Sequence, residues 1–246
     1  HYLTECSHEV TLLERGRLAH EASYGNAGLI VPSQCVPLAS PYALKLVKKW
    51  LFRKNSPVKV SLRPSPRLIS WMVKFYNACK SEEFQENRNL LKTLGDRSLE
   101  LFKELDSQGI EFEFEKKGVL DAFADESNFT SAVVGAEELR DEGFQMEVLD
   151  REAAMDIEPS LSDSVVGGIF HPEDAQGNSL LFVQSLASRA SSRGARIIEN
   201  ADVRGFEIDA GKVTAVNTRN HRVVCDIVVV AAGAWSNFLA KTIGDN

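Results

Sequence analysis

The first residues with chemical potential follow a short apolar run near the start of the chain. Residues 8–16 are typical of a buried parallel strand that ends in Glu14 and then a turn glycine. A carboxylate at the end of such a strand can accept hydrogen bonds from the ribose hydroxyls of an adenosine nucleotide. The glycine turn G-x-G-x-x-G that normally makes this signal specific does not accompany it, so Glu14 could equally be a surface residue that ends a strand.

A loop of small and polar residues follows at positions 22–28. Its two glycines allow backbone amides to approach a ligand closely. The Ser23 hydroxyl and the Asn26 amide can bond to a phosphate or to the edge of a ring. The alternative is a flexible surface loop, although the apolar run that follows at 29–32 is expected to pack inside the protein.

A third candidate lies near the end of the chain, at positions 226–236. The β-branched run 226–233 predicts a buried strand that ends in small residues and a glycine. Open α/β sheets bind ligands at the carboxyl ends of their strands, and small residues there leave room for a cofactor. A plain strand-to-helix turn would look the same.

Bulk composition excludes several classes of function. The chain has 246 residues and a net charge of -7, which argues against a nucleic acid partner because phosphate binding needs a positive field. Its four cysteines and five histidines do not cluster, so we expect neither a zinc site nor a disulfide framework, and we assign no histidine a catalytic role. There is no convincing Ser-His-Asp set and no phosphate-binding G-K-[ST] loop.

A basic, aromatic stretch covers residues 45–74. Lysines and arginines beside tryptophan and phenylalanine would suit a membrane surface, but an ordinary helix with one solvated face is the favoured interpretation. The sequence shows no apolar run long enough to span a bilayer and no signal peptide at its start. We expect a cytoplasmic protein, with peripheral contact to the inner face of the cell membrane as the open alternative.

The pattern of elements predicts an α/β fold. A Rossmann-like layer is expected at both ends of the chain, with an α+β insertion between, so that strands from the two ends must meet in one sheet. The expected domain bounds are 1–89 and 162–246 for the layer and 90–161 for the insertion. Helices are expected over 82–108, 129–142 and 180–193, and from Asp150 as an N-cap; strands are expected over 165–171, 196–199, 203–208 and 212–217, and an antiparallel hairpin over 112–123.

The order of these motifs resembles the D-amino acid dehydrogenase branch of the FAD-dependent D-amino acid oxidase and glycine oxidase family. The resemblance runs through most of the chain. Its most specific parts are residues 10–15, 23–28, 36–38 with 45–52, 168–174 and 231–236.

The resemblance implies FAD as the cofactor and assigns positions to it. Glu14 would bind the adenosine ribose, with Arg15 beside it near the adenine. The pyrophosphate and flavin ring would be lined by Ser23, Asn26, Ala27 and Gly28, the adenine would be held by the backbone of Val203, and the groove would be closed by Ala232, Gly233 and Trp235. The insertion would form the substrate domain. Against the family pattern, we expect the chain to be partial, without the G-x-G-x-x-G unit and without the C-terminal portion that supplies substrate contacts.

The implied activity is oxidation of a D-amino acid to a 2-oxo acid and ammonia. Electrons would pass to a quinone or another carrier, and the protein could form an oligomer. Two alternatives stay open: an oxidase of glycine, sarcosine or proline, and a truncated, catalytically silent relative that serves as a binding subunit. A nicotinamide enzyme fits the loop after Glu14 less well.

Overall fold

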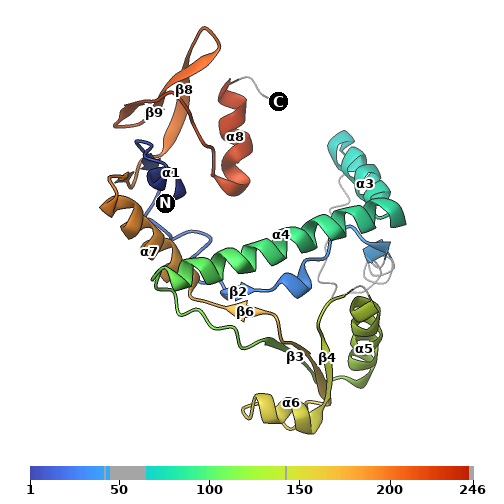
Figure 1. Cartoon of the computed structure of the whole chain (residues 1–246). Helices are drawn as coiled ribbons and strands as arrows, with labels where there is room; N and C mark the ends of the chain where they lie inside the picture. The colour runs from blue at the N-terminus through green and yellow to red at the C-terminus, as the bar shows by residue number, and fades with distance from the viewer. Residues whose placement is uncertain (42, 45–64, 142, 244–246) are drawn as a thin grey trace. The chain divides into compact units, whose positions relative to one another are not determined.

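The computed structural model describes residues 1–41, 43–44, 65–141 and 143–243 (Figure 1). These form two compact units. Unit 1 comprises residues 1–28, 109–113 and 178–246, and unit 2 comprises residues 29–108 and 114–177. The bounds predicted at residues 90 and 161 divide the chain by role, between cofactor and substrate, and stay a prediction. Residues 45–64 of the basic, aromatic stretch lie outside the described residues.

Unit 1 is organised around a parallel strand pair. Helix α1 (Tyr2–Glu5) precedes strand β1 (Thr11–Leu13), which pairs in parallel with β7 (Arg196–Ile198). Helix α7 (Ser179–Ser192) leads into β7, and the Asn178 side chain caps its N-terminus by accepting a hydrogen bond from the Leu181 amide at 3.0 Å. Segments from the two ends of the chain therefore meet in one parallel layer, which confirms that expectation.

An antiparallel sheet completes the strands of unit 1. Strands β8 (Val203–Asp209), β9 (Lys212–Thr218) and β10 (Arg222–Val224) form a meander in the order β10-β9-β8. Ala210 and Gly211 both have positive φ, at 48° and 78°, which is the two-residue turn that matches the twist of a hairpin. The expected meander is confirmed and is one strand longer than predicted.

An ion pair joins the two outer strands of this meander. The Arg222 guanidinium donates two hydrogen bonds to the Glu207 carboxylate, at 2.9 and 2.6 Å, and the Asn217 amide donates a third at 3.1 Å. The hydrogen bonds from Arg222, followed by that from Asn217, lower the pKa of Glu207 to about 2. In the folded sheet, the Glu207 carboxylate is therefore ionised near neutral pH.

The strand predicted over residues 226–233 is not formed. No strand pairs with these residues in the part of the chain that the structure describes, and they run as irregular backbone into the short helices η2 (Gly233–Trp235), α8 (Ser236–Ala240) and η3 (Lys241–Ile243). The side chains of Ile227 and Val229 are 79% and 71% exposed. A β-branched run favours extended backbone, but a strand also needs a hydrogen-bonding neighbour, and sequence pattern cannot supply one.

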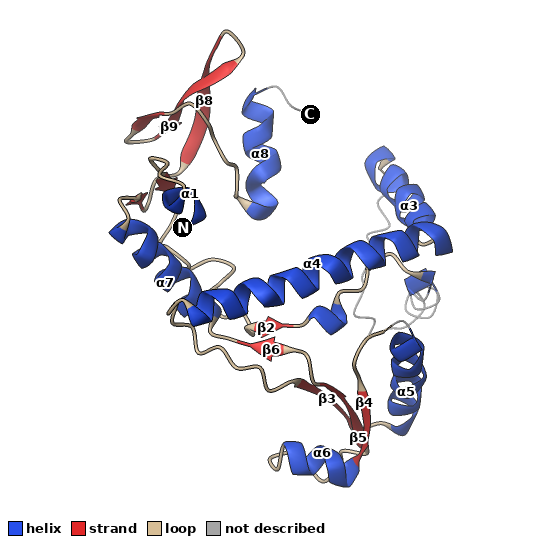
Figure 2. Ribbon diagram, viewed as in Figure 1, coloured by secondary structure: helices blue, strands red, loops and turns tan. Residues whose placement is uncertain are grey.

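Unit 2 is built on a three-stranded antiparallel sheet. Strand β5 (Gly167–His171) lies between β3 (Val119–Phe123) and β4 (Glu147–Asp150). Helices α5 (Glu126–Asp141) and α6 (Arg151–Ile157) pack on this sheet (Figure 2). The predicted N-cap of α6 is confirmed, because the Asp150 carboxylate accepts a hydrogen bond from the Ala153 amide at 2.9 Å.

Two consecutive glycines in β5 allow both helices to approach. A Cβ added at Gly167 would lie 2.4 Å from the Phe129 ring of α5, and one added at Gly168 would lie 3.7 Å from Ala154 of α6. Successive residues of a strand face opposite sides of the sheet, so α5 and α6 cover opposite faces. The core between α5 and the sheet contains Ala136, Phe144, Met146 and Ile169, with Phe123, Phe129, Ala132, Val133 and Leu139 packed against it.

The hairpin predicted over residues 112–123 is wrong. Phe112 is buried against Phe182 of α7, Glu115 forms a bridge with Gln176, and Val119–Phe123 pairs with β5 instead of with its neighbour in sequence. The alternating pattern correctly indicated extended backbone. The strand partners lie 44 to 61 residues further along the chain, where local periodicity carries no information.

The described part of unit 2 also contains a short strand pair and further helices. Strand β2 (Leu29–Ile30) pairs with β6 (Ala175–Gln176) and leads into the short helix η1 (Pro32–Gln34), with α3 (Pro66–Ala78) and α4 (Ser81–Ser107) later in the chain. Helix α4 confirms the helix predicted over 82–108. It packs on η1 through Gly95, where an added Cβ would lie 2.7 Å from the Cys35 sulfur.

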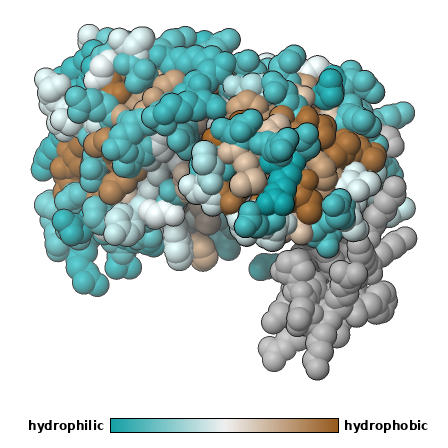
Figure 3. Space-filling model, turned by 90° about the horizontal axis from the view of Figure 1, so that it is seen from below, coloured by the Kyte–Doolittle hydropathy of each residue, from teal (hydrophilic) through white to brown (hydrophobic). Residues whose placement is uncertain are grey.

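Apolar side chains also reach the surface, and Figure 3 shows groups of them among hydrophilic residues on one face. Large exposed examples include Leu38, Ile69, Trp71, Tyr76 and Phe238. Within the described ranges, no helix combines the length and hydropathy that a bilayer crossing requires.

We expect Gly167→Ala to lower the free energy of unfolding by about 2 kcal/mol, because the added methyl must displace the Phe129 ring or the Leu149 carbonyl oxygen. Gly135→Ala, within α5 of the same unit, is the matched control. An added Cβ there meets nothing within 4 Å, and alanine favours a helix, so this variant should be neutral or slightly stabilising. Chemical denaturation measures both; equal midpoints for the two variants would contradict the packing described for β5.

Candidate functional site

Two carboxylates follow the paired strands of unit 1. Because β1 and β7 are parallel, Glu14 and Glu199 follow Leu13 and Ile198 at the same edge of the layer. The Glu14 carboxylate accepts a hydrogen bond from the Gly16 amide at 2.8 Å, and the Glu199 carboxylate accepts one from the Leu18 amide at 2.6 Å. Both side chains therefore order the loop after β1. Glu199 was not identified from the sequence, although its place at the end of an expected strand was a usable signal.

The Glu14 side chain retains an open acceptor. Its Oε1 atom accepts the Gly16 hydrogen bond, and its Oε2 atom has no hydrogen-bond partner among the described residues. A half-buried carboxylate with one oxygen fixed and the other available is suited to accept a hydroxyl donor such as a ribose.

Arg15 and Trp235, far apart in sequence, lie in contact. The Arg15 guanidinium carbon is 4.7 Å from the centroid of the Trp235 ring, and its Nη2 atom lies 3.0 Å from a carboxylate oxygen of Glu21. A cation over an indole face is a favourable pair, and a planar guanidinium there can also stack on a flat ligand. The contact brings the end of the chain to the strand edge that carries Glu14.

The segment before β8 lies beside the same edge. The Ala201 amide donates a hydrogen bond to the Glu14 carbonyl at 2.8 Å, and this places Val203, two residues on, close to it along the chain. Ala232 precedes η2, and its carbonyl accepts a hydrogen bond from the Trp235 amide at 2.9 Å. At Gly233 φ is +53° and an added Cβ would meet nothing within 4 Å.

Hydrogen bonds fix the loop that contains Ser23, Asn26, Ala27 and Gly28. The Asn26 side chain accepts a hydrogen bond from the Gly28 amide at 2.8 Å, and the Ser23 carbonyl accepts one from the Ser179 hydroxyl at 2.8 Å. Among the described residues, no hydrogen bond or ring contact joins these four residues to Arg15 or Trp235. The structure thus brings together Glu14, Arg15 and Trp235, with Val203 close by, and leaves the loop as a separate group.

In unit 2, a buried carboxylate joins the short helix η1 to the β2–β6 strand pair. Asp174 is fully buried beside β6 and accepts hydrogen bonds from the Ser33 amide at 3.2 Å and the Ser33 hydroxyl at 2.5 Å. A buried charge needs such donors, because desolvation is otherwise costly. The pair fixes η1 against the β2–β6 strands. Asp174 lies in a segment that carries the family resemblance, but its role was not recognised from the sequence.

Among the described residues of unit 2, His171 and Cys35 do not form a reactive set. His171 is buried, and its Nε2 atom lies 3.2 Å from a carboxylate oxygen of Asp121. Burial, and then the charges of Asp174 and Asp96, raise the pKa of the Cys35 thiol, so it is not a ready nucleophile near neutral pH. In the described part of the chain, no three His, Cys, Asp or Glu side chains come together as a metal site.

Comparison with known proteins shows the family to which the chain belongs. The family model described as FAD dependent oxidoreductase matches residues 1–246, and the chain belongs to that family. D-amino acid dehydrogenases of Rhizobium rhizogenes and Sinorhizobium medicae are 30% and 32% identical over 98% of this chain. A glycine oxidase structure from Bacillus cereus aligns with a TM-score of 0.70 at 23% identity, over 98% of this chain and 53% of that chain, and shows a shared fold. The chain spans 59% of the length of the curated relatives it matches.

The cofactor that this family implies is FAD, and the residues of unit 1 fit its adenosine end. Glu14 offers an open acceptor, Arg15 and Trp235 offer flat surfaces, and side-chain space above Gly25 and Gly233 is open, since an added Cβ at either would meet nothing within 4 Å. The individual residue assignments stay predictions.

We expect Asp174→Ala to lower the free energy of unfolding by about 3 kcal/mol, because it leaves the Ser33 amide and hydroxyl buried without an acceptor. Asp163→Ala is the matched control: its carboxylate is 95% exposed and pairs only with exposed Arg151, so its removal should cost well under ~1 kcal/mol. Urea denaturation compares the two. Similar losses for both variants would show that the buried pair does not stabilise unit 2.

Proposed function

We propose that the protein catalyses the FAD-dependent oxidation of D-amino acids. The net reaction converts a D-amino acid, water and an oxidised acceptor into a 2-oxo acid, ammonia and the reduced acceptor. The carbon–nitrogen bond is first oxidised to an imine by loss of two electrons and two protons, and water then releases ammonia. A quinone or another electron carrier is the proposed acceptor.

The observation that supports this proposal is the Glu14, Arg15 and Trp235 cluster in a chain whose sequence relatives are D-amino acid dehydrogenases. The residues come from both ends of the chain and converge at the carboxyl end of a parallel strand pair, where open α/β sheets bind nucleotides. The relatives match along 98% of the chain, which includes these positions.

Each residue has a proposed role in holding the cofactor. Glu14 accepts hydrogen bonds from the ribose, Arg15 and Trp235 cover the adenine side of the groove, and the backbone of Val203 contacts the adenine. The loop with Ser23, Asn26, Ala27 and Gly28 lines the pyrophosphate and flavin ring, while Ala232 and Gly233 close the groove together with Trp235. When bound, FAD would supply the two-electron redox chemistry of the reaction.

The activity is tested on the longest protein that the gene encodes, loaded with FAD. We expect it to reduce an artificial dye in the presence of D-amino acids and to leave the L-enantiomers unoxidised, with 2-oxo acid and ammonia formed in equal amounts. Glycine, sarcosine and proline are tested in the same panel. A preference for one of these with direct oxygen consumption would replace the dehydrogenase proposal by an amine oxidase, and failure to take up flavin would favour a silent binding subunit.

Cofactor binding is tested separately by Glu14→Gln. The amide keeps an acceptor for the Gly16 amide but loses the charge offered to the ribose, so the dissociation constant for FAD should rise about tenfold. Glu9→Gln, an exposed carboxylate just before β1, is the matched control and should leave it unchanged. Quenching of flavin fluorescence on titration with the protein measures both. An equal dissociation constant in the two variants would remove Glu14 from the cofactor site.

A further inference from the structure

Two side chains from much later in the sequence bind the backbone of the loop at residues 15–28. The Glu199 carboxylate accepts a hydrogen bond from the Leu18 amide at 2.6 Å, and the Ser179 hydroxyl donates one to the Ser23 carbonyl oxygen at 2.8 Å. Both contacts lie within unit 1. The loop is therefore held from outside at two separate points.

The contact of Glu199 extends a backbone connection that begins in the parallel strand pair. The Glu14 amide donates a hydrogen bond to the Ile198 carbonyl at 2.9 Å, and the Asn200 amide donates one to the Gly16 carbonyl at 2.9 Å. Asn200 has a φ of 53°, in the left-handed region that asparagine adopts more often than most residues. The Glu199 carboxylate adds Leu18 to the loop residues that the segment after β7 holds.

The position of Arg15 depends on this first part of the loop. Its guanidinium lies over Trp235 and is 3.0 Å from a carboxylate oxygen of Glu21. Leu18 lies between Arg15 and Glu21 in the sequence, so a fixed Leu18 amide limits the movement of both. Loss of the Glu199 contact should therefore loosen the cluster that offers flat surfaces to an adenine.

The contact of Ser179 acts on the second part of the loop. Ser179 is the first residue of α7, and the Asn178 side chain caps that helix, so the hydroxyl extends from an ordered backbone. The hydrogen bond from the Gly28 amide to the Asn26 side chain lies further along the loop than Ser23. The two outside contacts thus hold different stretches of the loop.

We propose that Glu199 and Ser179 are positioning residues of the FAD site. Glu199 acts on the adenosine end of the cofactor, and Ser179 acts on its pyrophosphate and flavin end. These roles rest on the cofactor placement proposed above. Neither side chain has to touch FAD, because each acts through the backbone of the loop. The two ends of the cofactor should therefore respond separately to the two residues, which a general loss of stability would not produce.

The test is titration of the longest protein that the gene encodes with FAD and with AMP, which is the adenosine end alone. Glu199→Ala should raise both dissociation constants about fivefold, because a hydrogen bond to a charged acceptor is lost. Ser179→Ala should raise the dissociation constant for FAD about threefold and leave that for AMP unchanged. Glu199→Gln keeps an acceptor and Ser179→Thr keeps a hydroxyl, so both should restore wild-type binding.

Amide hydrogen exchange follows the loop without any cofactor. Glu199→Ala should speed exchange about threefold or more in residues 15–21, and Ser179→Ala should do the same in residues 24–28. Each variant should leave the other stretch unchanged. Unchanged exchange in the rest of the chain shows that both variants fold.

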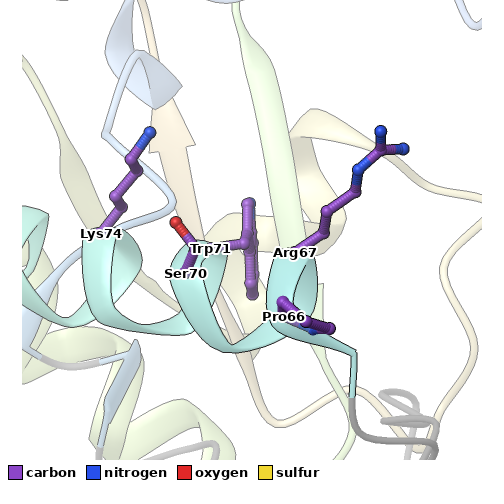
Figure 4. A pocket seen from close by; sticks show the side chains of 5 residues that line it. All are labelled: Pro66, Arg67, Ser70, Trp71 and Lys74. Carbon is purple, nitrogen blue, oxygen red and sulfur yellow. The ribbon is translucent and has the colours of Figure 1, made fainter.

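Control variants leave the loop contacts in place. Glu9→Ala removes an exposed carboxylate of unit 1, and Ser188→Ala removes an exposed hydroxyl of α7, so neither should change a dissociation constant. A nucleotide phosphate could also bind at a hollow of about 400 Å³ on α3, where Arg67 and Lys74 extend on either side of Trp71 (Figure 4). Arg67→Gln should leave AMP binding unchanged.

The possible failures are distinguishable. Wild-type exchange and wild-type dissociation constants in both alanine variants would overturn the positioning roles and leave the proposed FAD site standing. An equal loss of AMP binding in both variants would also overturn these roles, because it indicates a general loss of stability. A wild-type protein that binds neither FAD nor AMP would overturn the proposed function, and the positioning roles with it.

Discussion

The parallel pairing of Thr11–Leu13 with Arg196–Ile198 is the interaction on which the candidate site depends. It closes a loop of more than 180 residues. Closing a loop of that length costs conformational entropy, which the contacts formed afterwards must offset. In return it sets Glu14 and Glu199 at one edge of one layer. Arg15 can then contact Trp235, and the segment before β8 lies against Glu14. Without this pairing the site residues would be separate loops.

In unit 2, a buried carboxylate rather than a strand pair joins segments that are far apart in the sequence. Asp174 and Ser33 are 141 residues apart, and their two hydrogen bonds fix the β2–β6 strands and η1 in one arrangement. A carboxylate with no exposure tolerates few alternatives, since any shift that loses a donor leaves an unpaired charge away from water. Directional polar contacts thus specify a geometry that the two-residue strands could not hold alone.

Local features were predictable from the sequence and long-range ones were not. The strand before Glu14, helix α4, helix α7 and the Asp150 cap follow from spacing within a few residues, and the structure contains them. The predictions of a hairpin over 112–123 and of a strand over 226–233 were wrong. An extended segment becomes a strand only when it pairs with another segment, and the local residue pattern does not show which segment that is. Asp174 was missed for the same reason, because it acts through Ser33, 141 positions away. Glu199 was missed although it stands at the end of an expected strand, as Glu14 does. Family resemblance supplied Arg15, Trp235 and Val203, and the structure gave the contacts of the first two.

The irregular segment at 226–232 has a consequence for the behaviour of the chain in solution. After Asp226 it consists of Ile227, three valines and two alanines, with no charge and no proline, and its side chains are largely open to solvent. Such a segment is a template for cross-β self-association, in which identical strands from different molecules satisfy one another's amides. At high concentration this segment is therefore where precipitation of the chain would begin, and a single lysine placed in it would act as a gatekeeper.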